Sequence, residues 1–213
     1  MSIRVKEFVM SAISPEAPLM PKVSKTKRAI LDAALELSAR GGITGTTMDD
    51  VALEAGVAKG SVYYNFTSKD QLFEALMDDG LGQFHAFLLG VRGDLVGPAA
   101  LRALVEGTLD RIRDNQAMAK LLVAELFRTD RMWRESLTIV RNRLIGVFAD
   151  VLQDIDGGTS VAAEIRASAI FGAVLVAGLE WVVFDPERSR DETAEAILSV
   201  FSPAYITGVS VAG

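Results

Sequence analysis

The sequence has no cysteine and a single histidine among its 213 residues. The lack of cysteine excludes disulfide bonds, thiolate metal sites and cysteine nucleophiles, and it fits a chain that works in a reducing cytoplasm. His85 has no companions at ligand spacing, so we expect neither a metal site nor a cofactor. Nucleophile-elbow, phosphate-loop and zinc-hydrolase motifs are also missing, and we therefore expect no enzyme.

Long hydrophobic runs are scarce as well. The 18 residues from Ala167 to Phe184 include one charged side chain, Glu180, and approach the lower length limit of a membrane-spanning helix. Glu164 and Arg166 stand just before this run, and two glycines lie inside it. We therefore predict a buried helix of a soluble bundle or dimer, with no membrane partner.

Positive charge is in short supply, with 22 Lys and Arg against 28 Asp and Glu and a formal net charge of −6. This excess of acid argues against bulk attraction to nucleic acid. The charge is unevenly spread, because residues 22–70 hold seven basic and six acidic side chains, whereas residues 71–213 hold 13 basic and 20 acidic ones. Charge alone therefore neither supports nor excludes DNA binding.

The hydrophobic pattern is helical nearly throughout, with little β-type alternation, and predicts an all-α fold. Glycine and proline interrupt the pattern at intervals typical of helix connections. The expected helices cover residues 24–40, 47–55, 59–65, 68–89, 98–114, 116–128, 131–153, 159–184 and 190–207.

Three regions are expected along the chain. Residues 1–21 contain three prolines and no clean signal peptide, and they predict a flexible N-terminal extension. Residues 22–70 predict a three-helix domain, and residues 71–213 a larger helical domain. Ser68 and Gln71 form a capping box that starts the helix linking the two domains.

Residues 46–66 predict a helix-turn-helix, in which two short helices are joined by a glycine-containing turn. Thr47 is a good N-cap for the first helix, with Asp50 as a weak capping-box partner. Gly56 can adopt the positive φ that a tight turn requires. The second helix starts at Lys59 and presents polar and aromatic side chains that can reach base edges in the major groove. An ordinary helical hairpin is the alternative for a pattern of this kind.

This stretch resembles the DNA-binding motif of the tetracycline-repressor (TetR) family. The resemblance covers about residues 26–76 and rests on Ala52-x-x-Ala55-Gly56-Val57-Ala58-Lys59-Gly60-Ser61-Val62-Tyr63-Tyr64-Asn65-Phe66-x-Ser68-Lys69-x-x-Leu72, preceded by Gly42-x-x-x-Thr46-Thr47. It implies that Thr47, Tyr63 and Lys69 contact phosphates. It also implies that Lys59, Ser61, Tyr64 and Asn65 face bases, although the family often has His or Tyr at the position of Asn65.

The resemblance further implies that the C-terminal domain dimerises and encloses a ligand pocket. Small residues recur every fourth position in the expected 159–184 helix and permit close helix packing, and the last helix adds apolar side chains. The candidate dimer residues are Ala169, Ala173, Ala177, Ile197 and Phe201, for which an intramolecular core is the alternative. The candidate pocket residues, a set of a kind that more often forms plain core, are Met118, Leu122, Glu125, Phe127, Trp133, Phe148, Phe171 and Trp181.

Two carboxylates in apolar segments, Glu125 and Glu180, are expected to need a partner if they are buried. An internal arginine such as Arg141 or a cationic ligand would meet that need. The sequence as a whole predicts a ligand-responsive repressor, a homodimer that binds a palindromic double-stranded operator and is released by a small-molecule effector. The alternative is a helical small-molecule-binding or scaffold protein of the same fold that lacks specific DNA binding.

Overall fold

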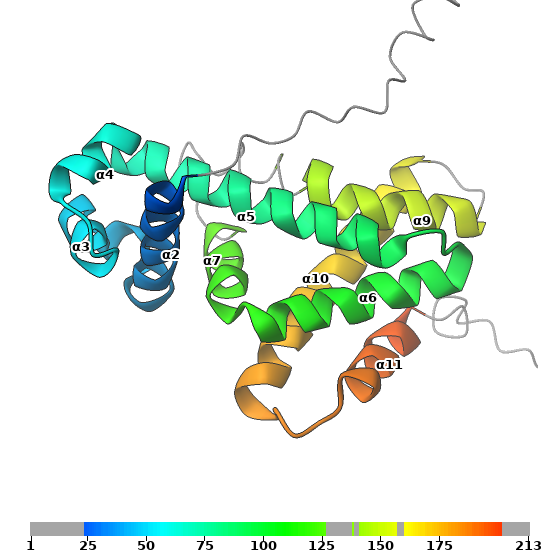
Figure 1. Cartoon of the computed structure of the whole chain (residues 1–213). Helices are drawn as coiled ribbons and strands as arrows, with labels where there is room; N and C mark the ends of the chain where they lie inside the picture. Colours follow the sequence, from blue (N-terminus) through cyan, green and yellow to red (C-terminus); the bar gives the residue numbers. More distant parts are fainter. Residues whose placement is uncertain (1–23, 127–137, 139–140, 157–159, 202–213) are drawn as a thin grey trace, which may run out of the picture.

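The computed structural model describes residues 24–126, 138, 141–156 and 160–201, and every regular element within these ranges is helical (Figure 1). The all-α prediction is confirmed. Three helices form a compact group at one end of the molecule: α2 (Lys25–Gly45), α3 (Met48–Glu54) and α4 (Lys59–Asn65).

The long helix α5 (Lys69–Arg92) leaves this group and runs along the rest of the molecule (Figure 1). Ser68 caps it by accepting a hydrogen bond from the backbone N–H of Gln71, as predicted. The predicted capping box is not completed, because Oε1 of Gln71 accepts from the backbone N–H of Thr67 at 2.6 Å and not from that of Ser68. The elements that follow pack against α5 or against one another: α6 (Gly97–Asp114), α7 (Gln116–Leu126), η1 (Arg141–Ile145), α9 (Gly146–Asp156), α10 (Ser160–Phe184) and α11 (Arg190–Val200).

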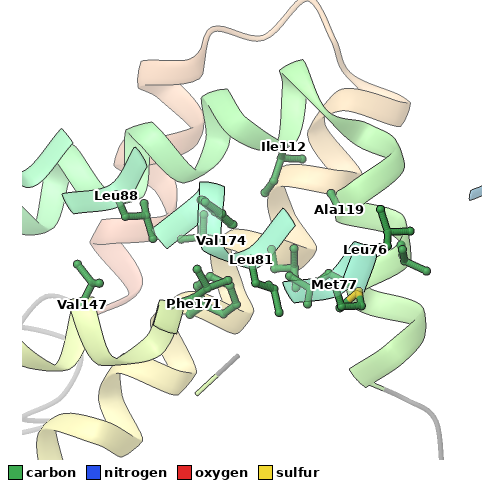
Figure 2. Close-up of a cluster of buried hydrophobic side chains, with 14 of the residues drawn as sticks. Leu76, Met77, Leu81, Leu88, Ile112, Ala119, Val147, Phe171 and Val174 are labelled. Atoms are coloured by element: carbon green, nitrogen blue, oxygen red, sulfur yellow. The ribbon is translucent and has the colours of Figure 1, made fainter. Parts of the chain in front are cut away.

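The core of the larger part of the molecule lies where α5, α6, α7, α9 and α10 meet (Figure 2). Apolar side chains from all five helices point into this space, and α5 contributes its buried stripe of Leu76, Met77, Leu81 and Leu88. The same helix contacts α2 through its first turns. Helix α5 is therefore shared by both parts of the chain and connects them mechanically.

In its described part the expected helix over residues 131–153 is helical, but it is not α-helical throughout. A π-helical turn, η1, precedes α9 and ends just before Gly146. This turn is docked on α5 by Arg143, whose Nη2 donates to Oδ1 of Asp78 at 2.6 Å, while the Arg143 carbonyl lies 2.5 Å from Nδ1 of His85. The extra residue of a π-turn is a local feature that apolar periodicity does not reveal.

Helix α10 contains the one described segment, Val161–Phe184, that is long and apolar enough to cross a membrane. Only 39% of its most apolar window is buried within the single chain. The buried face packs against α6, α7, α9 and α11, as expected for a helix of a bundle. Glu180 is exposed, so the condition under which it was expected to need a partner is not met.

Candidate DNA-binding site

Helix α3 begins where the sequence predicted, at a capping box built by Thr47 and Asp50. Oγ1 of Thr47 accepts a hydrogen bond from the backbone N–H of Asp50 at 3.1 Å, and Oδ2 of Asp50 accepts one from the backbone N–H of Thr47 at 3.3 Å. These two bonds satisfy amide groups that a helix N-terminus leaves without partners. The box therefore fixes the start of α3, with Thr47 exposed beside it.

The turn between α3 and α4 depends on Gly56, which has a φ of 65°. This is the left-handed region that side chains with a Cβ rarely adopt. The turn is closed by the backbone N–H of Val57, which donates to the Ala52 carbonyl at 3.0 Å. The orientation of α4 relative to α3 thus follows from one glycine and one short hydrogen bond.

A small apolar core holds α4 against the other two helices of the group. Val51 on α3 and Val62 on α4 are fully buried, and Phe66, which follows α4, is 2% exposed. Ile30 and Ala34 complete the core from α2. Because one face of α4 is anchored in this way, its opposite face must point to solvent.

That outward face carries the residues predicted to contact DNA. The side chain of Tyr64 is 89% exposed, and that of Tyr63 is 45% exposed. Lys59 is exposed at the start of the same helix, and Ser61 is half-buried one turn away from Tyr64. The structure therefore brings Lys59, Ser61, Tyr63 and Tyr64 together on one short helix.

Lys59 does not stand free on this face. Its Nζ lies 2.6 Å from Oδ2 of Asp49 on α3 and 5.9 Å from the centre of the Tyr63 ring. The hydrogen bond to Asp49 raises the pKa of Lys59 above its ordinary value. The sequence analysis did not predict this pair, because a spacing of ten residues across a turn does not indicate which side chains will meet.

Asn65 and Lys69 are arranged differently from the prediction. Nδ2 of Asn65 donates to the Ser61 carbonyl at 2.8 Å, which turns the amide back onto its own helix. Nζ of Lys69 donates to the carbonyls of Ile43 and Thr44 at 3.1 and 3.2 Å, at the end of α2. Both side chains stabilise the group of helices in this structure, and their contact with DNA stays a prediction.

Known proteins share this N-terminal arrangement. Residues 30–76 match the family described as "Bacterial regulatory proteins, tetR family". The HTH-type transcriptional regulator SrpR of Pseudomonas putida is 24% identical over 83% of this chain and 82% of its own length. The HTH-type transcriptional regulator RutR of Escherichia coli (strain K12) is 32% identical over 54% of this chain and 55% of its own length. The chain is a TetR-family transcriptional regulator.

The likeness extends to the whole fold. A TetR-like transcriptional regulator from Rhodococcus sp. RHA1 superposes with a TM-score of 0.69 and 26% identity, covering 86% of this TetR-family chain and 97% of that one. The FadR regulator of Bacillus subtilis, solved in complex with stearoyl-CoA, superposes with a TM-score of 0.65 and 21% identity, covering 85% and 98% of the two chains. The family consists of regulators that bind DNA through the helix-turn-helix, not of enzymes.

A second candidate site lies in the C-terminal part of this TetR-family chain. Met118 and Leu122, two of the predicted pocket residues, line an apolar void of about 20 Å³ between α5, α6, α7 and α10. The void has room for about one water molecule. Gly80 on α5 faces the Met118 side chain so closely that an added Cβ would collide with it. The Met118 side chain therefore lies directly against α5 at Gly80.

Three other predicted pocket residues do not line this void. Phe148, Phe171 and Trp181 are at most 3% exposed and belong to the packed core. Glu125 lies near the end of α7, whereas Phe127 and Trp133 lie outside the described residues. The void instead includes two polar residues that the sequence analysis did not single out, Arg111 and Asn115.

Proposed function

We propose that this regulator is a repressor that binds a palindromic operator as a homodimer and leaves it when a small-molecule effector with an apolar part enters the C-terminal domain. The observation that carries the proposal is the outward face of α4, where Lys59, Ser61, Tyr63 and Tyr64 stand on a helix braced from behind. Lysine pairs well with guanine O6 and N7, and tyrosine hydroxyls bind phosphate oxygens.

Dimerisation is supported by an exposed apolar stripe along α10, here called the α10 stripe. Its members follow one another at helical spacing, and four of the side chains are at least half exposed: Val161, Ile165, Val176 and Val183, with Ala169 and Gly172 between them. An exposed apolar band of this length on a soluble protein marks an interaction surface. We propose that a second copy of the chain covers it.

The predicted dimer residues divide between this stripe and the core. Ala169 is exposed, and Ala173 and Ala177 are half-buried beside the stripe. Ile197 is 7% exposed within its own chain, packed among core residues, and Phe201 is half-buried. Ile197 therefore serves the fold of the single chain, and the proposed interface is centred on α10.

A dimer of this kind matches the geometry of DNA. Recognition helices held about 34–36 Å apart can enter successive major grooves on one side of the duplex. A two-fold symmetric protein then requires a palindromic sequence, because each half-site meets the same helix. Loss of that spacing would release the operator without any change in α4 itself.

An apolar ligand with a polar end fits the void beside Met118. Its lining is apolar except for Arg111 and Asn115, which can meet a polar or anionic group. The ligand must push the flexible Met118 side chain aside, since the void is too small as it stands. A long-chain acyl-CoA is the first probe to test, because stearoyl-CoA is bound in the similarly folded FadR of Bacillus subtilis.

Helix α5 connects the proposed ligand site with the DNA-binding helices. Two adjacent aspartates on α5 bind arginines from the two parts of the molecule. Asp78 pairs with Arg143 of η1 in the C-terminal part. Asp79 accepts two hydrogen bonds, of 2.6 and 3.1 Å, from Arg28 of α2 in the DNA-binding part. Gly80, next in sequence, faces Met118. A ligand that displaces Met118 thus acts on α5 beside both attachments, and it shifts the equilibrium only as far as it prefers one of the two states.

Selection of genomic fragments on the purified protein tests the proposal. We expect enrichment of one palindrome, bound by two chains, with an affinity that falls steeply as salt rises because phosphate contacts release counterions. Stearoyl-CoA added to that complex is expected to release the DNA. A dimeric protein that enriches no sequence and shows no salt-dependent binding would instead indicate a ligand-binding or scaffold protein of the same fold.

Two substitutions on α4 separate base reading from phosphate binding. We expect Tyr63→Phe to weaken binding by a similar factor of about 5 on every duplex, because it removes one hydroxyl from a phosphate contact. Lys59→Ala is expected to weaken operator binding by about 5- to 100-fold and also to relax the preference at one base pair. Affinities on the operator and on single-base variants provide the measurement. Equal loss of preference in both variants would contradict the assigned roles.

A further inference from the structure

Glu180 interrupts the α10 stripe between Val176 and Val183. It is exposed in the single chain and takes part in none of the ion pairs that the described residues form. In the proposed dimer this side of α10 is covered by a second copy. A carboxylate that is withdrawn from water needs an oppositely charged partner, so a basic group of the second copy would stabilise it.

Arg166 is the one basic residue of α10, and it precedes Glu180 by fourteen residues. Fourteen residues make nearly four helical turns, so the two side chains leave α10 on the same side but about 21 Å apart along its axis. They therefore cannot meet within one chain. Arg166 is half-buried and its Nε donates to the Ala162 carbonyl at 3.4 Å, but a guanidinium group has five N–H donors and can bind a carboxylate as well.

We propose that the two copies of α10 pack antiparallel about a two-fold axis at Ala173, so that Glu180 of each chain binds Arg166 of the other. The inference rests on the proposed homodimer and deepens it, since it fixes the direction and the register of the interface. Two-fold symmetry forms the contact twice in each dimer.

The small residues of the helix point to the same axis as its charges. Ala173 lies midway between Arg166 and Glu180, and Ala169 and Ala177 lie four residues to either side of it. Small side chains there allow two helix axes to approach closely, because the interaxial distance depends on the side chains at the contact. Parallel packing would instead place the two copies of Glu180 against each other, and facing like charges are unfavourable.

Charge reversal tests the pairing through the choice of partner. Glu180→Arg alone sets arginine against arginine at both contacts of its homodimer, and Arg166→Glu alone sets glutamate against glutamate. When the two variants are co-expressed, only the mixed dimer has opposite charges at both contacts. Native mass spectrometry of chains that differ in length by a tag counts the three kinds of dimer.

Tagged and untagged wild-type chains should form about one half mixed dimers, as random pairing of identical interfaces gives. We expect each repulsive homodimer to be weakened at least about tenfold, so the reversed pair should form more than about nine-tenths mixed dimers. Circular dichroism verifies that each variant keeps its helices.

Glu74 on α5 provides the matched control, because it is an exposed glutamate outside α10. Co-expression of Glu74→Arg with Arg166→Glu uses the same two types of substitution. The mixed dimer then has one attractive and one repulsive contact and lies midway in stability between the two homodimers. The mixed fraction should therefore stay at about one half.

Single cysteines locate the axis independently, since the chain itself has none. Two copies of Ala173→Cys should be joined by a thiol reagent about 10 Å long, because packed helices lie about 8–10 Å apart. Two copies of Val161→Cys should not be joined, because antiparallel packing separates them by about 36 Å. Random mixing of the reversed pair, or no cross-link through Ala173→Cys, would overturn the inference and leave the proposed homodimer intact. A wild-type chain that stays monomeric would refute the proposed homodimer and the inference with it.

Discussion

A single glutamate placed in the α10 stripe is expected to split the dimer and to lower operator affinity at least about 100-fold. Val176 is 62% exposed in the single chain and lies near the middle of the stripe. In the proposed dimer, Val176→Glu would bury a carboxylate against apolar partners, and an unpaired buried charge costs several kcal/mol. Two-fold symmetry doubles that cost, because both copies carry the substitution.

Loss of the dimer weakens DNA binding because a single chain reaches only one half-site. The second recognition helix of a dimer binds at a high effective concentration once the first is in place, and this gain disappears with the interface. The folded chain itself should be unaffected, since the substituted side chain points to water in the monomer. Sedimentation measures the mass in solution, anisotropy measures the affinity for the operator, and circular dichroism follows the helices.

Val96→Glu is the control for this experiment. Val96 is the same residue type and even more exposed, at 71%, but it lies in the turn before α6 rather than on α10. We expect this variant to remain dimeric and to bind the operator like the wild type. A dimeric Val176→Glu variant with full operator affinity would show that the α10 stripe is not the interface.

The parts of the DNA-binding motif that are fixed by local chemistry could be predicted from the sequence. A capping box requires two suitable residues three positions apart, and a left-handed turn favours a glycine. The cap formed by Thr47 and Asp50 and the turn at Gly56 could therefore be predicted from the sequence. The apolar spacing of α4 likewise fixes which face is buried. These features depend on neighbours in the chain, which a sequence displays directly.

The partners of polar side chains could not be predicted in the same way. The return of Asn65 to the Ser61 carbonyl is one of several bonds that an asparagine can make. The engagement of Lys69 by the end of α2 depends on helix packing across more than twenty residues. The pair between Lys59 and Asp49 depends on the angle between α3 and α4. Each is a tertiary contact, for which spacing in sequence gives little guidance.

Pocket and core were also indistinguishable from the sequence, because both are lined by the same apolar residue types. Met118 lines a void, whereas Phe148 does not, although both were candidates. The difference lies in how completely neighbouring helices fill the space around each side chain. Only the packed structure supplies that information.

Phe148→Ala is expected to lower the free energy of unfolding by about 3–5 kcal/mol, the usual result of removing a buried aromatic ring. The Phe148 side chain on α9 is fully buried, and its ring meets that of Phe171 on α10 edge to face, with centroids 6.0 Å apart and planes at 69°. Figure 2 shows Phe171 directed into the core beneath α5, among Val174 and Leu81. Loss of the ring therefore removes contacts on both helices and leaves a cavity that close packing cannot fully close.

Urea unfolding followed by circular dichroism measures this loss, at one fixed protein concentration because the proposed dimer would contribute to stability. Tyr64→Ala provides the comparison, since it removes an aromatic ring that is 89% exposed and should change the free energy of unfolding by less than about 0.5 kcal/mol in the absence of DNA. Phe148→Leu should restore part of the loss, because it fills part of the volume. A loss below about 1 kcal/mol in Phe148→Ala would mean that the ring borders open space, as an effector pocket would provide, and not a filled core. The outcome thus decides whether the junction of α9 and α10 is filled core or offers space that an effector could occupy.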